Sequence, residues 1–152
     1  RFDNRETMFY RGLIIAFTVL IGGLIWSNQV DPARANEINT SNEKVSPPIT
    51  TISTQEKINF AKYLSDNKFV MYSAYWCPHC NDQKQLFGKE AVNKLIIIEC
   101  AKDGKNNEYK LCQDKGIEGF PSWEINNEIY SGTRSLRELA QMTNYEGSLN
   151  FE

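Results

Sequence analysis

The hydrophobic and polar positions divide the chain into three parts. Residues 12–26 carry no charge and are mostly apolar, residues 31–53 hold three prolines and many Asn, Ser and Thr without apolar periodicity, and regular patterns begin at Thr54. These patterns predict a membrane-spanning segment within residues 1–30, a flexible linker over 31–53 and a globular domain over 54–152.

The first part has the composition of a transmembrane helix. Its charge-free core is short for a bilayer, but the flanking apolar residues extend it into the interfaces. A cleaved signal peptide that starts at Met8 and ends near Ala33-Arg34-Ala35 is the alternative. Three arginines precede the apolar run and one closely follows it, so both alternatives place the rest of the chain outside the cytoplasm.

From Thr54 onward, helical and strand patterns alternate. Residues 95–100 begin with four consecutive aliphatic side chains, which is typical of a strand buried on both faces, and Asn126-Asn127 suits a tight hairpin turn. The predicted elements are a helix over 54–65, a strand over 69–75, a helix from Cys77 to about Gly88, a short helix over 90–93, a strand over 95–100, a helix over 106–115, strands over 123–125 and 128–130, and a helix over 136–143. This order predicts an α/β fold, a mixed sheet with helices on both faces.

Composition and charge restrict the classes of function. A formal net charge of −2 over 152 residues provides no basic face, so we expect no nucleic-acid partner. The four cysteines form an even set, which suits disulfide pairing in an oxidising compartment. The chain begins with Arg1 and not with methionine, and we therefore expect it to be a piece of a longer protein.

The candidate chemistry lies at a strand-to-helix junction, where Cys77-Pro78-His79-Cys80 forms a Cys-x-x-Cys pair. Proline suits the first helical position because the N–H that it lacks would have had no partner there. Cys77 then lies near the N-cap, where unpaired N–H groups and the helix dipole favour the thiolate over the thiol. Zinc binding is the alternative, but the other two cysteines are separated by eleven residues and His79 lies inside the pair, so we expect no metal.

The order of the elements resembles the thioredoxin fold over about residues 54–145. The Cys-x-x-Cys pair follows the first strand, and Gly119-Phe120-Pro121-Ser122 precedes the hairpin. In that fold the proline at this place is cis and packs against the active-site cysteines. The resemblance therefore implies a cis bond between Phe120 and Pro121.

A closer resemblance covers nearly the whole chain. Residues 71–90, the pair Cys100 and Cys112, and residues 119–126 are similar to the thioredoxin-like domain at the C-terminus of bacterial and plastid vitamin K epoxide reductase homologues. In that family the apolar helix, here residues 12–26, is the last transmembrane helix of a quinone-reducing domain, which favours the membrane anchor over the signal peptide. The resemblance implies reduced substrate proteins and this membrane domain as partners, with the thioredoxin-like domain in the periplasm or thylakoid lumen. Quinone belongs to the membrane domain, and we expect no cofactor in this chain.

The resemblance also implies roles for single residues in disulfide-bond formation. Cys77 and Cys80 are the expected catalytic pair, in which a substrate thiolate attacks Cys77 and a second substrate thiol resolves the mixed disulfide. Pro78 and His79 are expected to stabilise the Cys77 thiolate. Alternatively, His79 is an exposed helix residue without a redox role. The expected substrate contacts are Trp76, Phe120 and Pro121, and a place in the core is the alternative for the two aromatic residues.

Two features favour the oxidising direction. An imidazole at His79 can stabilise the reduced form, which makes the disulfide a stronger oxidant. The buried carboxylate that thioredoxins place on the strand before the motif has no counterpart, because Met71 stands at that position, so Cys80 lacks a proton acceptor. A reductase or isomerase that uses the same cysteines is the alternative.

The remaining cysteines and charged residues near the motif are expected to be structural. Cys100 and Cys112 should form a disulfide between the end of a strand and the next helix, and an electron relay with Cys77 and Cys80 is the alternative. Lys84, Lys89 and Glu90 are expected to form a solvated helix face.

Overall fold

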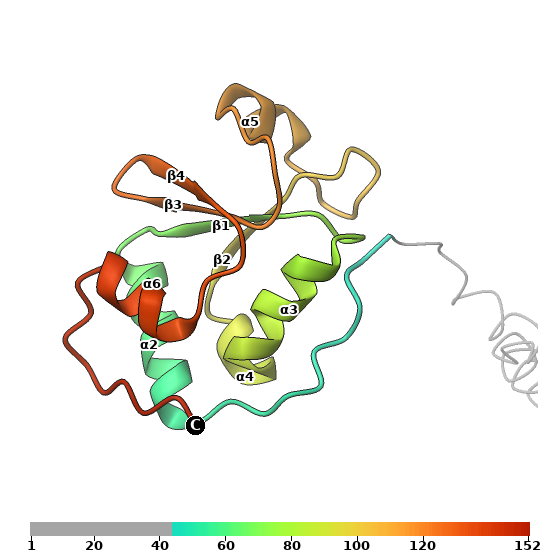
Figure 1. The fold of residues 1–152 in the computed structure, drawn as a ribbon. Coiled ribbons are helices and arrows are strands. Elements are labelled where there is room, and N and C mark those ends of the chain that lie inside the picture. The colour runs from blue at the N-terminus through green and yellow to red at the C-terminus, as the bar shows by residue number, and fades with distance from the viewer. Residues whose placement is uncertain (1–43) are drawn as a thin grey trace, which may run out of the picture. The chain divides into compact units, whose positions relative to one another are not determined.

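The computed structural model describes residues 44–152, and the predicted membrane-spanning segment lies outside the described residues, as does most of the predicted linker. None of the helices within 44–152 has the length and apolar character needed to cross a bilayer. The elements are α2 (Gln55–Asp66), β1 (Val70–Ser73), α3 (Pro78–Phe87), α4 (Lys89–Val92), β2 (Ile96–Glu99), α5 (Tyr109–Asp114), β3 (Ser122–Ile125), β4 (Glu128–Ser131) and α6 (Leu136–Met142) (Figure 1).

The strands form one mixed sheet of four strands in the order β2-β1-β3-β4. β1 pairs with β2 in parallel and with β3 antiparallel, and β3 pairs antiparallel with β4. This thioredoxin-like α/β arrangement confirms the predicted mixed sheet. It corrects one detail, because β2 is an edge strand whose residues are all half-buried, although its aliphatic run predicted burial on both faces.

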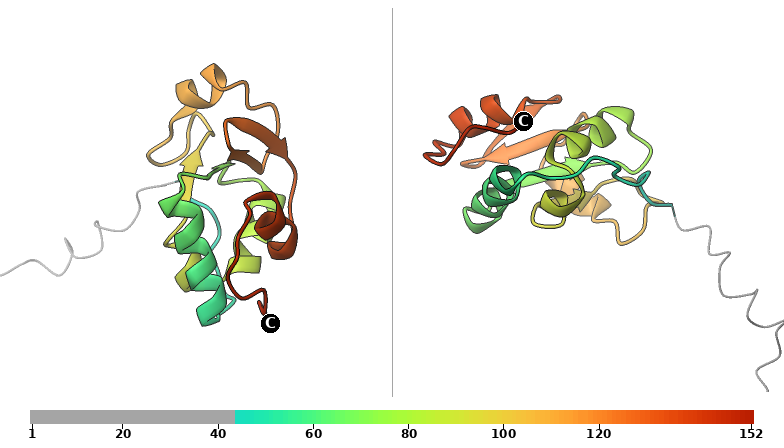
Figure 2. Two further views of the ribbon diagram at one scale, coloured as in Figure 1. Left: turned by 90° about the vertical axis from the view of Figure 1, so that its left-hand side faces the viewer. Right: turned by 90° about the horizontal axis from the view of Figure 1, so that it is seen from below.

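Helices cover the two faces of the sheet unequally. Side chains from α2, α3, α4 and α6 form the main core with Met71 and Trp123 of the sheet. Tyr72 points to the other face because neighbouring residues of a strand alternate, and it packs there with Cys112 of α5. Figures 1 and 2 show α5 apart from the other helices accordingly. The opposite face carries the smaller of the two clusters.

Residues 44–53, which we call the N-terminal strap, have no helix or strand but are attached to the domain. The side chain of Thr51 donates to the backbone carbonyl of Gln85 (2.6 Å), and the backbone N–H of Ser53 donates to Glu90 (2.9 Å). A side chain on Gly88 would lie 2.7 Å from the backbone nitrogen of Ser53, so glycine permits the close approach. This part of the predicted linker therefore packs along α3 and α4.

Candidate functional site

The Cys-x-x-Cys pair lies where β1 ends and α3 begins. Cys77 is the N-cap of α3, Pro78 is its first residue, and the Cys77 sulfur accepts a hydrogen bond from the backbone N–H of Cys80 (3.4 Å). Both cysteines are free thiols; Cys77 is 6% exposed and Cys80 1%. Cys77 is therefore the more accessible sulfur, with Cys80 behind it.

The loop before β3 forms the opposite side of the site. The Phe120–Pro121 peptide bond is cis, as the resemblance implied. The Cys77 thiol lies 3.5 Å from the backbone oxygen of Phe120 and is placed to donate to it. The Ser122 hydroxyl donates to the carbonyl of Gly119 (2.8 Å), which fixes the loop on the other side of the proline. Cys77 thus faces a backbone oxygen that does not belong to its own helix.

Two aromatic residues border Cys77. Trp76 is 60% exposed, and its ring meets that of Phe120 edge to face with centroids 6.0 Å apart. A place in the core, the alternative for Trp76, is therefore excluded. A large exposed aromatic ring beside a reactive sulfur provides an apolar surface that an incoming peptide can cover.

His79 lies on the outer side of α3. Its side chain is 75% exposed, and its Nδ1 lies 3.7 Å from a carboxylate oxygen of Asp82. This contact directs the imidazole toward a neighbouring residue of the same helix. Its expected role in tuning the Cys77 thiolate stays a prediction.

Cys80 is the buried partner of the pair. Burial raises the pKa of its thiol to about 11; the Ser73 hydroxyl and the Ala74 backbone lower it in part, and the neighbouring Cys77 raises it further. The thiolate fraction of Cys80 at pH 7 is then on the order of 10⁻⁴. Cys80 therefore stays protonated in the reduced form.

Two charged residues that lie near the Cys77–Cys80 pair were not identified in the sequence analysis. Lys84 is 7% exposed, so its expected place on a solvated face is wrong, whereas Lys89 and Glu90 are exposed as expected. The strap covers Lys84, whose ammonium donates to the Ser46 hydroxyl (2.9 Å). The i, i+4 spacing from Cys80 to Lys84 could have predicted that Lys84 lies on the same helix face as Cys80, because residues so spaced share a face.

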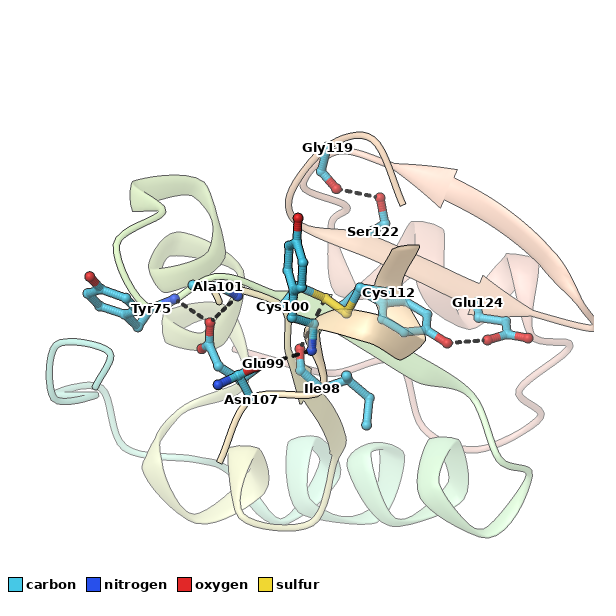
Figure 3. The surroundings of a disulfide bond; sticks show 12 residues. Tyr75, Ile98, Glu99, Cys100, Ala101, Asn107, Cys112, Gly119, Ser122 and Glu124 are labelled. Atoms are coloured by element: carbon cyan, nitrogen blue, oxygen red, sulfur yellow. Dashed lines mark hydrogen bonds between the residues drawn. A yellow bond between two sulfur atoms is a disulfide. The ribbon is translucent and has the colours of Figure 1, made fainter. Parts of the chain in front are cut away.

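Glu99, at the end of β2, is the second missed residue. One of its carboxylate oxygens accepts hydrogen bonds from the backbone N–H groups of Tyr75 (3.1 Å) and Ala101 (2.8 Å) (Figure 3). Met71, which the sequence analysis aligned with the thioredoxin carboxylate, is fully buried. A half-buried carboxylate thus lies on the neighbouring strand instead.

Cys100 and Cys112 are joined by a disulfide that ties the chain after β2 to α5 (Figure 3). Both are 3% exposed and pack with Tyr72. The free pair, Cys77 and Cys80, belongs to the main core instead. The two cysteine pairs therefore occupy separate clusters, which favours a structural disulfide over an electron relay. Within residues 44–152, no group of three His, Cys, Asp or Glu side chains is arranged to hold a metal ion.

Gln83 connects the thiol-bearing helix to the rest of the site. It is fully buried, and its amide donates to the carbonyl of Arg134 (3.0 Å) and accepts from the N–H of Arg134 (2.8 Å) and from the indole of Trp123 (3.3 Å). It therefore fixes α3 against β3 and the segment before α6.

Replacing Gln83 by leucine is expected to lower the free energy of unfolding by about 2 kcal/mol, because buried polar groups of Arg134 and Trp123 would lose their partner. Urea unfolding followed by tryptophan fluorescence measures this change. The exposed Gln113→Leu is the matched control and should stay within about 0.5 kcal/mol of the wild type. Equal stability of the Gln83 variant and its control would contradict the role given to this amide.

Comparison with known proteins agrees with this geometry. Over 88% of its length the chain is 36% identical to the thiol-disulfide oxidoreductase LTO1 of Arabidopsis thaliana. The chain is a homologue of LTO1. The match confirms the resemblance to the vitamin K epoxide reductase homologues with a thioredoxin-like domain. The chain spans 37% of the length of LTO1. No protein-family model matches the chain.

More distant similarities point to the same class of chemistry. The chain is 27% identical to a probable protein disulfide-isomerase A6 of Medicago sativa over 70% of its length, which is 31% of that relative. It is 28% identical to a protein disulfide-isomerase of Humicola insolens over 59% of its length, 19% of that relative. The LTO1 homologue is thus a thioredoxin-like protein with similarity to several disulfide oxidoreductases.

Proposed function

We propose that this LTO1 homologue introduces disulfide bonds into extracytoplasmic proteins through Cys77 and Cys80. The observation that carries the proposal is the position of the Cys77 sulfur, at the N-cap of α3 and 3.5 Å from the backbone oxygen of Phe120 beside a cis-proline. A thiol pair that can form a disulfide and a backbone oxygen that can pair with a peptide meet at this point.

The reaction begins with the oxidised pair. A substrate thiolate attacks the Cys77 sulfur, the bond between Cys77 and Cys80 breaks, and Cys80 leaves as a thiolate that takes up a proton. A second substrate thiolate then attacks the substrate sulfur of the mixed disulfide and releases the Cys77 thiolate. The substrate loses two electrons and two thiol protons, and the pair gains the two electrons.

The substrate peptide would bind across the cis-proline loop. The Phe120 oxygen that faces the Cys77 thiol in the free enzyme is an acceptor within reach of a bound backbone N–H. The exposed face of Trp76 would cover an apolar side chain next to the substrate cysteine. Backbone pairing tolerates many sequences, which suits an enzyme that oxidises several proteins.

The high pKa of Cys80 favours resolution of the mixed disulfide by a second substrate thiol over its release by Cys80. To release a mixed disulfide in the reducing direction, Cys80 must attack as a thiolate, and burial, which raises its pKa to about 11, keeps that form scarce at neutral pH. Resolution by a second substrate thiol does not need this thiolate. Pro78, as the first residue of α3, and His79 would add to the stability of the reduced form through the helix terminus and the imidazole.

The reduced pair must be reoxidised in every cycle. We propose a vitamin K epoxide reductase-type membrane domain as the partner, whose own disulfide would take the two electrons and two protons and pass them to a quinone. LTO1 extends well beyond the region that this chain matches, which leaves room for such a domain in the relative. The predicted membrane anchor would hold the thioredoxin-like domain at the extracytoplasmic surface, close to that partner.

A single-turnover experiment tests the proposal. The full chain in detergent, with the Cys77–Cys80 disulfide formed, is mixed with one equivalent of a reduced peptide that carries two cysteines. We expect the peptide to lose both thiols and the protein to gain two within seconds to minutes, as counted by alkylation and mass spectrometry. A peptide that keeps its thiols would refute the proposal.

The similarity to protein disulfide-isomerases favours a second candidate, a reductase or isomerase that uses the same cysteines. Equilibration with glutathione separates the two functions. An oxidase should have a reduction potential well above the roughly −270 mV of thioredoxin, whereas a reductase should lie near that value.

A further inference from the structure

Lys84 lies on the same face of α3 as the two thiols. It follows Cys80 by four residues and Cys77 by seven, which are the spacings that bring helical side chains into line. Cys80 and Lys84 are both among the buried residues of this helix. A cation and the buried thiol of Cys80 therefore share one face of α3, and the strap covers the cation.

The surroundings of Lys84 are mostly withdrawn from solvent. The Ser46 hydroxyl accepts the hydrogen bond of its ammonium, and burial lowers the pKa of the amine. The charges that Cys80, Glu99 and Cys77 carry when they are ionised oppose that lowering, in this order of strength. Glu99 is itself held by two backbone N–H groups and is directed toward Tyr75 and Ala101. The thiols are thus electrostatic partners of a partly desolvated ammonium group.

We propose that Lys84 is a positioning residue that sets the redox equilibrium of the Cys77–Cys80 pair by stabilising the Cys77 thiolate of its reduced form. The inference deepens the proposed function and rests on it only for the identity of the redox pair. A disulfide carries no charge, whereas a thiolate does, so a fixed positive charge on the same helix face favours the dithiol state. Screening by water is weak at this site because the lysine is 7% exposed.

The test measures the equilibrium in which the protein disulfide and two glutathione thiols give the protein dithiol and glutathione disulfide. Lys84→Met is expected to shift this equilibrium about tenfold toward the protein disulfide, which corresponds to a potential about 30 mV lower. Lys84→Arg keeps the charge and should stay near the wild type. Lys110→Met removes the same charge at a side chain that is 85% exposed and should leave the equilibrium unchanged.

The outcomes are distinct. An unchanged equilibrium in Lys84→Met, or an equal shift in Lys110→Met, would overturn the inference. The proposed function can fail separately: if the peptide keeps its thiols while Lys84→Met shifts the glutathione equilibrium, the lysine still tunes the pair but the pair does not oxidise peptides. If the peptide is oxidised and the equilibrium does not respond to Lys84→Met, only the inference is wrong.

A measurement on the unmodified chain avoids any loss of folding in the variants. Carbon-13 NMR of the lysine side chains follows the titration of Lys84, assigned by its absence in Lys84→Arg, in the oxidised and the reduced protein. The ammonium is expected to lose its proton at a higher pH in the reduced protein, because coupling between two charged sites is reciprocal. Identical titrations in the two redox states would refute the inference.

Discussion

Cys77→Ser is expected to reduce the rate of peptide-thiol oxidation by more than about 10³-fold, to the uncatalysed background. A hydroxyl cannot form the disulfide that the substrate attacks, and Cys80, 1% exposed, is not accessible to replace Cys77. The measurement is the loss of peptide thiols over time with stoichiometric protein. Because serine is close to cysteine in size, the N-cap of α3 should be retained, and the circular dichroism spectrum should match the wild type.

Cys80→Ala should behave differently, although it too abolishes turnover. Cys77 is then a single free thiol, and mixing with a peptide disulfide should leave a mixed disulfide that the missing second cysteine cannot release. Mass spectrometry under non-reducing conditions detects this adduct. Accumulation of the same adduct with Cys77→Ser would contradict the assignment of Cys77 as the more accessible sulfur of the pair.

The strand-to-helix junction could be predicted from the sequence because its signals are local. A buried strand, a proline at the first helical position and two cysteines in one turn fix the placement of the sulfurs whatever the rest of the fold does. The hairpin is a similar case, since both Asn126 and Asn127 adopt the positive φ angles that asparagine tolerates (54° and 65°). The loop of Pro121 depended on the resemblance, because a sequence without relatives does not state which proline is cis.

The environment of Lys84 could not be predicted because it depends on contacts distant in sequence. Its burial requires the strap, which contains Ser46, to fold back over α3, and a segment rich in Pro, Ser and Thr gives no periodic signal of where it will pack. The edge position of β2 also could not be predicted, because it too depends on contacts between segments distant in sequence. Ile97 packs against the main core and Ile98 against the second cluster, and strand order is a tertiary property that the run itself does not encode.

The disulfide between Cys100 and Cys112 provides the other large expected effect. The bond closes a loop with a sequence separation of 12 residues, and a loop of this length stabilises a fold by about 3 kcal/mol by restricting the unfolded chain. It also ties α5, a helix of six residues whose one buried residue is Cys112, to the chain after β2. The double variant Cys100→Ala/Cys112→Ala should therefore unfold at lower urea concentration, with a free energy of unfolding lower by about 3 kcal/mol.

The same double variant decides between a structural and a relay role. Because this disulfide packs with Tyr72 in the second cluster while Cys77 and Cys80 belong to the main core, we expect the glutathione equilibrium of the catalytic pair to stay within about twofold of the wild type. Single-turnover oxidation of the peptide should likewise proceed at an unchanged rate at temperatures where the variant is folded. An electron relay predicts the opposite pattern, in which stability changes little and the catalytic pair loses its coupling to an external oxidant or reductant. The two measurements on one protein thus separate the contribution of the disulfide to folding from any contribution to electron transfer.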